Sequence, residues 1–195
     1  MKIVHVDSSF KGREASSSAL ASQLVNRLVD GNEAQVHYRD LSQEPLNHLT
    51  EEVFAGFQLQ ADKRNEVQAA AVAQSDEYIA ELKDADALVV AVPMYNFSVP
   101  SQFKSWIDHV ARAGVSFSYT SEGPKGLLNI EKAYVIATRG GQFVGTGFDF
   151  QAPWIEQVLK FIGVQDVEFV FAEGQASDKA AQAIQQAEQK IAALV

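Results

Sequence analysis

The chain has 195 residues, 47% of them apolar, a formal net charge of −9 and no cysteine. The lack of cysteine excludes disulfides, thiolate nucleophiles and zinc–thiolate sites. The acidic charge argues against a nucleic-acid partner, because nucleic-acid binding needs Lys and Arg contacts to phosphate. No apolar run reaches the roughly 20 residues that span a bilayer. We therefore expect a cytoplasmic protein with one domain over residues 1–195, which carries out any redox chemistry through a bound cofactor.

The first part of the chain predicts two strands around a helix. Met1 to Asp7 has the β-branched content of a strand, and residues 8–18 read as a polar loop. Apolar residues at helical spacing follow, and the helix is expected to end at Asp30-Gly31-Asn32. The next expected elements are a strand at Gln35–Tyr38, a short helix at Glu51–Phe57 and a long helix at Asp62–Lys83.

The run Ala87 to Val92 is the central feature of the sequence. Six small or branched apolar residues follow one another without a break, which indicates a strand buried on both faces in the middle of a parallel sheet. Directly after it come Met94-Tyr95-Asn96-Phe97, two aromatic residues around an amide in a loop.

The second part of the chain continues the alternation of helices and strands. Pro100 is expected to be the first residue of a helix that stops at Gly114, and Ser177 is expected to cap the final helix. Between them we expect a small hairpin (Val115–Tyr119 and Gly123–Leu128), a strand (Ala133–Thr138), a helix (Pro153–Ile162) and a fifth strand (Val167–Phe171).

Five strands that alternate with helices predict an α/β sandwich, a parallel sheet with helices on both faces. Five strands suit the flavodoxin-like order 2-1-3-4-5, in which residues 87–92 form the third strand beside the first. The topological switch point then lies between Ser8-Ser9 and Met94-Tyr95, where ligands bind in open α/β sheets.

A phosphate site is expected where the first strand leads into the first helix. Ser9, Ser16, Ser17 and Ser18 offer hydroxyls there, and the helix start offers free N–H groups and a positive dipole end. The alternative is that one serine caps the helix and the others are solvated. Because neither a P-loop nor a Gly-x-Gly-x-x-Gly dinucleotide motif is present, a mononucleotide fits better.

A flat aromatic ligand is expected against the loops that follow the third and fourth strands. Met94 to Phe97 form one loop, and Arg139-Gly140-Gly141 form the other, whose glycines permit close backbone approach. Arg139 and the loop amides would favour negative charge on a reduced ring. The alternatives are that Met94 to Phe97 only pack against the protein, that the two glycines form a simple turn and that Arg139 is a surface charge. The four histidines lack metal-ligand spacing, so no metal site is expected.

Several motifs in chain order resemble the FMN-dependent NADH-azoreductases, also called NADH:quinone oxidoreductases. The resemblance covers nearly the whole chain. The motifs that carry it are Pro93-Met94-Tyr95-Asn96-Phe97, Ala111-Arg112-Ala113-Gly114-Val115, Phe117-x-Tyr119-Thr120, Thr138-Arg139-Gly140-Gly141, Phe161-Ile162-Gly163 and Phe169-Val170-Phe171-Ala172-Glu173-Gly174.

The resemblance implies a flavodoxin-like homodimer with one FMN in each subunit. By position, Ser9 and Ser16 to Ser18 would hold the phosphate, and Met94 to Phe97 with Thr138 to Gly141 would hold the ring. Tyr119 and Phe161 fall where aromatic residues line the substrate space near the subunit interface. Phe143 is expected in the same substrate pocket and stands where some members have histidine.

The activity implied by the resemblance is ping-pong transfer of a hydride from NADH through FMN to a quinone or an azo compound. Cleavage of an azo bond to two amines takes four electrons and therefore two NADH. No protein acid or base is assigned, because solvent supplies the protons. A flavodoxin-like electron carrier and a flavin-binding regulatory module without turnover are the alternative functions.

Overall fold

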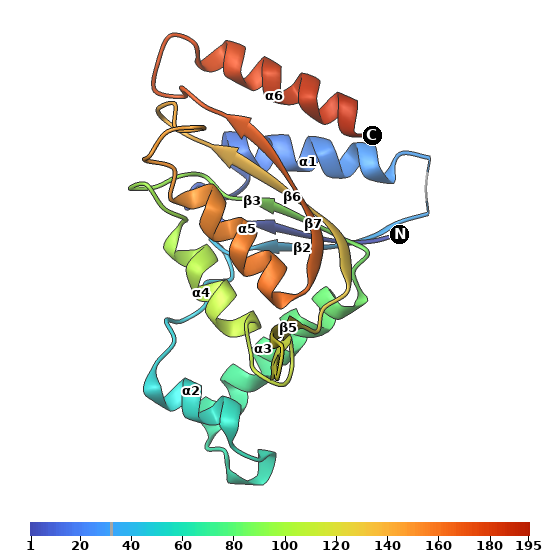
Figure 1. Ribbon diagram of the computed structural model, residues 1–195, viewed down its shortest axis with the longest axis vertical. Coiled ribbons are helices and arrows are strands. Elements are labelled where there is room, and N and C mark those ends of the chain that lie inside the picture. Colours follow the sequence, from blue (N-terminus) through green and yellow to red (C-terminus); the bar gives the residue numbers. More distant parts are fainter. Residues whose placement is uncertain (32) are drawn as a thin grey trace.

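Five parallel strands form the central sheet of the computed structural model, which describes residues 1–31 and 33–195 (Figure 1). Their order is β2-β1-β3-β6-β7, which confirms the predicted order 2-1-3-4-5. The strands are β1 (Lys2–Asp7), β2 (Gln35–Asp40), β3 (Ala87–Ala91), β6 (Ile130–Thr138) and β7 (Val164–Ala172). Every pairing in this sheet is parallel, so the carboxyl ends of the strands meet at one edge.

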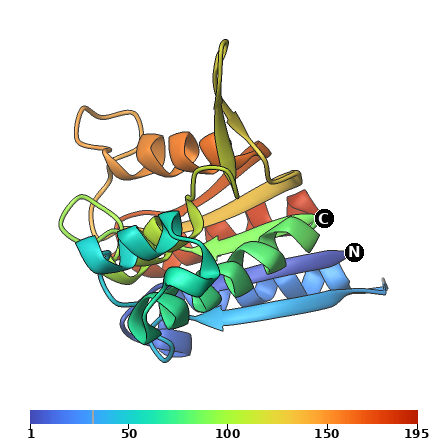
Figure 2. The same cartoon turned by 90° about the horizontal axis from the view of Figure 1, so that it is seen from below.

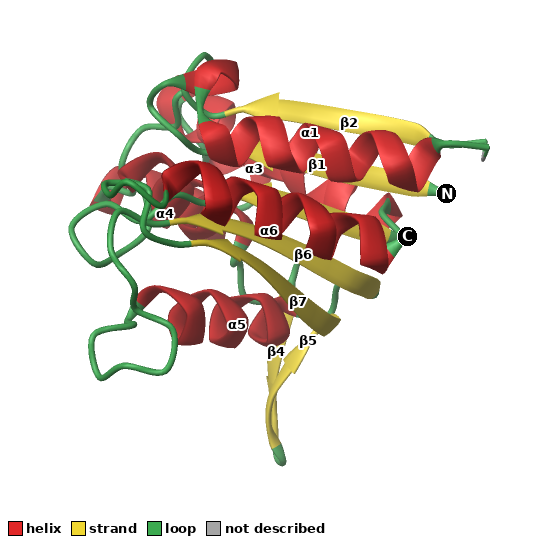
Figure 3. Cartoon of the chain, turned by 90° about the horizontal axis from the view of Figure 1, so that it is seen from above, coloured by secondary structure: helices red, strands yellow, loops and turns green. Residues whose placement is uncertain are grey.

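Helices cover both faces of the sheet (Figures 1 and 3). One face packs against α1 (Ser16–Val29) and α6 (Ala180–Leu194), and the other packs against α3 (Glu66–Asp84), α4 (Ser101–Val110) and α5 (Gln151–Ile162). The short α2 (Glu51–Gln58) lies beside α3, and 3-10 turns occupy Gly12–Glu14 and Ala61–Lys63.

The central strand β3 explains why its sequence is apolar without alternation. Leu88 and Val90 enter the core under α3, α4 and α5, while Val89 and Ala91 enter the core under α1 and α6. All four are 0% exposed. Successive side chains of a strand point to opposite faces, so a strand covered on both sides needs apolar residues at every position.

A two-stranded hairpin projects from the sheet edge that carries β6 and β7 (Figures 2 and 3). It consists of β4 (Phe117–Thr120) and β5 (Gly123–Gly126), as expected. Its return segment is tied to the end of α5 by a hydrogen bond from the Leu128 amide to the Ile162 carbonyl, 3.0 Å long.

Two helix starts differ from the sequence expectation. The long helix α3 begins at Glu66 rather than Asp62, because Asn65 and Gln68 form a capping box that starts it. Ser177 does not cap the last helix, which begins at Ala180. Its hydroxyl instead donates to the Gly174 carbonyl and accepts from the Lys179 amide.

Three smaller points complete the comparison. Pro100 is the residue that precedes α4, which ends at Val110, four residues before the expected stop. Helix α1 is followed by Gly31 at φ +71°, in the expected turn, whereas Asn32 lies outside the described residues. Across the described residues, no helix combines the length and the apolar character that a membrane span requires.

Candidate functional site

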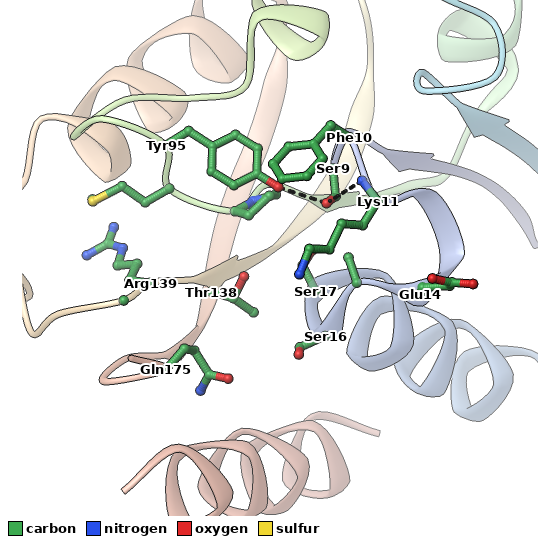
Figure 4. Close-up of a pocket in the computed structure, with 14 residues that line it drawn as sticks. Ser9, Phe10, Lys11, Glu14, Ser16, Ser17, Tyr95, Thr138, Arg139 and Gln175 are labelled. Atoms are coloured by element: carbon green, nitrogen blue, oxygen red, sulfur yellow. Dashed lines mark hydrogen bonds between the residues drawn. The ribbon is translucent and has the colours of Figure 1, made fainter. Parts of the chain in front are cut away.

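A pocket of about 280 Å³ lies at the carboxyl edge of the sheet, where β1, β3, β6 and β7 end (Figure 4). We call it the switch-point pocket, because it opens at the point where the strand order reverses between β1 and β3. Its lining residues are Ser9, Phe10, Lys11, Glu14, Ala15, Ser16, Ser17, Pro93, Met94, Tyr95, Thr138, Arg139, Gly140 and Gln175.

The segments after β1 and β3 are joined directly at this edge. The Ser9 hydroxyl and the Tyr95 hydroxyl are 2.8 Å apart and share a hydrogen bond, and the Lys11 amide donates to Ser9 Oγ. Directly before these contacts, where β1 and β3 end, the Ser8 hydroxyl donates to the Ala91 carbonyl. These contacts bring together the two loops that the sequence placed at the switch point.

The start of α1 supplies unpaired polar groups to the pocket. The residue before the helix is Ala15, which has no side-chain acceptor for the first N–H groups. Ser17 lines the pocket, and the hydroxyls of Ser17 and Ser18 are buried without a hydrogen-bond partner in the described chain. Buried polar groups are normally paired, so these two hydroxyls and the helix dipole favour an anionic ligand here.

The loop after β3 is a strained turn that faces the same region. Tyr95 and Ser98 exchange backbone hydrogen bonds of 3.0 Å, and the two residues between them, Asn96 and Phe97, have φ of +50° and +65°. A phenylalanine in the left-handed region is uncommon and points to a functional constraint. Within the described residues, the amides of Asn96 and Phe97 donate no hydrogen bond, so both are available to a ligand.

The loop after β6 forms the opposite wall. Thr138 and Gly140 line the pocket, and the Met94 amide donates to the Thr138 carbonyl at 2.8 Å, which holds the two loops together. Gly141 lies beside the ring of Phe143, where an added Cβ would come within 3.1 Å of that ring. Glycine at this position therefore leaves room for Phe143.

Arg139 has a role that differs from the sequence expectation. Its guanidinium is 0% exposed and forms salt bridges with Asp149 and Glu173, and it also donates to Gln151 and stacks on Phe171. Because two carboxylates already compensate its charge, Arg139 fastens the loop that leads to α5. Its side chain is not a free cation for a bound ring.

Two polar residues in the pocket were not expected from the sequence. Lys11 points its ammonium into the pocket from the β1–α1 segment, and Gln175 points its carboxamide in from the β7–α6 loop (Figure 4). Three backbone hydrogen bonds fasten that loop to the loop after β6, among them Gln175 N to Arg139 O at 2.9 Å. The Gln175 Nε2 atom is buried without a partner in the described chain.

The three aromatic residues assigned to substrate lie in two places. Phe143 contacts Phe97 edge to face, with ring centroids 5.7 Å apart, and neither residue is part of the lining of the switch-point pocket. Tyr119 and Phe161 both contact Phe117 at the base of the hairpin. Tyr119 lines a second pocket of about 300 Å³ with Phe54 and Phe117, and that pocket shares no lining residue with the switch-point pocket.

The geometry suits a flat ligand with an anionic tail. The start of α1 provides the place for the anion, and the loops after β3 and β6 provide backbone amides on two sides of a ring. Most of the predicted binding residues therefore converge on one site. The exceptions are Ser18, Asn96, Phe97 and Gly141, which adjoin the pocket in sequence but are not part of its lining.

Comparison with known proteins points to one family along the whole chain. A family model described as having a flavodoxin-like fold matches residues 1–195. The FMN-dependent NADH:quinone oxidoreductase of Burkholderia pseudomallei is 46% identical over 98% of both chains, and that of Dechloromonas aromatica is 43% identical over the full length of both.

Solved structures of similar shape carry related names. The crystal structure of the azoreductase AzrA superposes with a TM-score of 0.90, at 26% identity, over 100% of this chain and 98% of that one. An FMN-dependent NADH-azoreductase of Bacillus anthracis, crystallised in complex with FMN, superposes with a TM-score of 0.89 at 19% identity, over 99% and 96% of the two chains. The latter likeness supports the fold.

Proposed function

Because this chain belongs to the family of FMN-dependent NADH:quinone oxidoreductases, with the flavodoxin-like fold along its whole length, we propose that it reduces quinones with NADH while FMN is bound in the switch-point pocket. The observation that carries this assignment is the pair of buried, unpartnered hydroxyls at the start of α1. They lie at the N-terminus of the first helix, which favours an anion, and Ser17 lines the pocket together with residues of the loops after β3 and β6.

Residues that line the pocket or adjoin it in sequence fit FMN at both of its ends. Ser16 to Ser18 and the first N–H groups of α1 suit a phosphate, together with Ser9 across the pocket. The free amides of Asn96 and Phe97 suit the polar edge of an isoalloxazine ring. Gly140 allows the backbone to lie close to the plane of that ring.

FMN, when bound, supplies a carrier that accepts a hydride from NADH and passes it to the acceptor. The overall reaction consumes NADH, a quinone and one proton from solvent, and yields NAD⁺ and a hydroquinone. An azo compound is the proposed second acceptor class, and it takes two NADH and two protons to give two amines. The 26% identical azoreductase AzrA supports this class of acceptor.

The chain itself holds the loops around the pocket in place, which would orient the reactants. The Ser9–Tyr95 hydrogen bond and the Met94–Thr138 hydrogen bond hold three loops at fixed positions. Arg139 fastens the loop that carries Phe143, because Glu173 also accepts hydrogen bonds from the Phe143 and Val144 amides. The Phe97 and Phe143 rings pack edge to face and so connect the loops after β3 and β6 a second time.

We further propose that the protein acts as a homodimer in the cytoplasm, where NADH is available. The placement of Tyr119 and Phe161 supports the dimer. Both lie away from the switch-point pocket of their own chain, and Tyr119 is 75% exposed. In a dimer, these side chains would reach the pocket of the partner subunit and complete its substrate space.

Purification and a rapid-mixing experiment test the proposal. We expect a yellow protein whose flavin absorbance is bleached by NADH and restored by a quinone, with continuous NADH oxidation when both are present. A colourless protein that takes up no FMN would refute the assignment. A flavin-bound monomer that reacts slowly with NADH would favour an electron carrier, and tight FMN binding without turnover would favour a regulatory module.

A further inference from the structure

The switch-point pocket has few charged lining residues, and they differ in whether they are free to contact a ligand. Lys11, Glu14 and Arg139 are the charged residues among its lining. Arg139 is fully buried and paired with two carboxylates, and Glu14 is directed away from the centre of the pocket (Figure 4). Lys11 is therefore the one lining cation without a carboxylate partner in the described part of the chain.

The backbone holds Lys11 where an anion is expected. Its amide donates to Ser9 Oγ at 3.2 Å, and the next residue, Gly12, has φ of +55°, which turns the chain back toward α1. A Cβ at Gly12 would lie 3.0 Å from both the Asp40 carboxylate and the Ser42 hydroxyl, so glycine is favoured there. As a result, the ammonium of Lys11 extends toward Ser17 at the start of α1 (Figure 4).

A cation at this position would compensate phosphate charge that the other groups of the site leave unbalanced. The phosphate of FMN carries close to two negative charges at neutral pH, as phosphate monoesters do, and the protein as a whole has a net charge of −9. The N-terminus of a helix supplies only about half an elementary charge. The hydroxyls of Ser17 and Ser18 add hydrogen bonds but no charge.

We propose that Lys11 binds the phosphate group of FMN and is the residue that makes this site prefer FMN to riboflavin. This inference rests on the proposed function of the same pocket. Because Lys11 is exposed, solvent screens its attraction, and salt weakens it over a Debye length of about 10 Å at 0.1 M. The contribution of Lys11 is therefore a salt-dependent part of FMN affinity that riboflavin, which has no phosphate, does not experience.

Flavin titrations of the apoprotein test this inference. We would measure the Kd of FMN and of riboflavin by quenching of flavin fluorescence, at low and high NaCl, for the wild type, Lys11→Gln and Lys11→Arg. We expect Lys11→Gln to weaken FMN about tenfold at low salt, which is about 1.4 kcal/mol, and to leave riboflavin unchanged. Lys11→Arg should restore most of the affinity for FMN, because it keeps the charge.

Lys83→Gln is the matched control. It changes the net charge by the same amount, and Lys83 lies in the last turn of α3, just before β3 begins and so at the opposite edge of the sheet. It should leave both Kd values unchanged.

Equal loss of FMN and riboflavin binding in Lys11→Gln would indicate a merely structural role and would overturn the inference. Unchanged FMN affinity with an unchanged salt dependence would also overturn it. A wild type that binds no FMN would instead refute the proposed function.

Discussion

Removal of the Ser17 and Ser18 hydroxyls should affect FMN binding and protein stability differently. Both are buried and unpartnered in the described chain, so the Ser17→Ala/Ser18→Ala variant loses no hydrogen bond within the protein. Its free energy of unfolding should stay the same or rise slightly. Its FMN affinity should fall at least tenfold, because each hydrogen bond to a charged group contributes about 1.5–3 kcal/mol. Urea unfolding of the apoprotein and flavin titration measure the two effects.

Ser75 provides the opposite control. Its hydroxyl is also fully buried, but it donates to the His109 carbonyl and accepts from the Arg112 guanidinium. Ser75→Ala should therefore lower the free energy of unfolding by about 1–3 kcal/mol and leave the FMN Kd unchanged. If Ser17→Ala/Ser18→Ala were the destabilised variant, with normal FMN affinity, the phosphate would bind elsewhere.

Tyr38 makes the stability of the fold depend on alkaline pH. Burial, and then its 2.8 Å hydrogen bond to the buried carboxylate of Asp7, raise the pKa of Tyr38 well above its usual value. Below a pH of about 10 both the folded and the unfolded states keep the proton. Above it the unfolded state releases the proton and the folded state does not, so the free energy of unfolding falls as pH rises.

The variant Tyr38→Phe has no proton to release at this position, so its stability should fall less steeply above pH 10. Urea unfolding at several pH values between 9 and 11 measures the two slopes. Some dependence should remain in the variant, because burial also raises the pKa of Tyr78. Parallel curves for the wild type and Tyr38→Phe would contradict the prediction.

At the scale of elements, the join between α5 and the hairpin depends on Gly163. This residue has φ of +114°, and a Cβ on it would overlap the Leu128 carbonyl oxygen. Gly163→Ala should lose several kcal/mol of unfolding free energy: about 1–2 from the backbone conformation and about 1–3 from the overlap.

Gly31 is the matched comparison for Gly163. It also follows a helix and has φ of +71°, but a Cβ on it would meet nothing within 4 Å. Gly31→Ala should therefore cost only about 1–2 kcal/mol, the cost of the backbone conformation. Urea unfolding of both variants gives the comparison, and equal losses would mean that the contact between Gly163 and the hairpin does not matter.

Sequence patterns predicted every strand of the sheet and its order, because hydrophobic periodicity reflects burial directly. Helix starts were less predictable. The choice of Ala180 over Ser177 depends on a loop that is tied to another strand's loop through Gly174 N and Gly141 O, a contact between residues 33 positions apart in the sequence. Such long-range hydrogen bonds leave no local pattern that a single sequence reveals.

The same distinction applies to the site. The serines and the loops after β3 and β6 were predictable, because the topology alone brings the carboxyl ends of parallel strands together. The proposed role of Lys11 and the ion pairs of Arg139 were not. The direction of Lys11 follows from the turn at Gly12, and the pairing of Arg139 with Glu173 depends on where β7 ends. In both cases the side chain's partners are set by loop conformation.

At the scale of the whole molecule, the residues proposed for FMN and for substrate lie in two different pockets of one chain. A dimer could bring the pocket residues of two chains together. The switch-point pocket holds the proposed phosphate and ring contacts, whereas Tyr119 belongs to the other pocket, with Phe54 and Phe117. Exposed aromatic side chains at the hairpin and at α2, Tyr119 at 75% and Phe54 at 51%, are of the kind that protein interfaces bury.

If the homodimer combines the FMN of one subunit with Tyr119 of the other, two impaired variants should restore activity when they are combined in one dimer. At an FMN concentration that fills the wild-type site but lies below the raised Kd of the variant, Ser17→Ala/Ser18→Ala is mostly free of FMN but keeps Tyr119, whereas Tyr119→Ala lacks the aromatic ring but keeps the FMN site. A heterodimer purified through two different tags has one complete site, so its quinone reductase rate should be about half that of the wild-type dimer, since a two-fold dimer has two equivalent sites.

Each variant alone should be slow. A heterodimer as slow as its parents would place Tyr119 at the site of its own chain or outside the reaction, and sedimentation that gives a monomer would exclude the shared site.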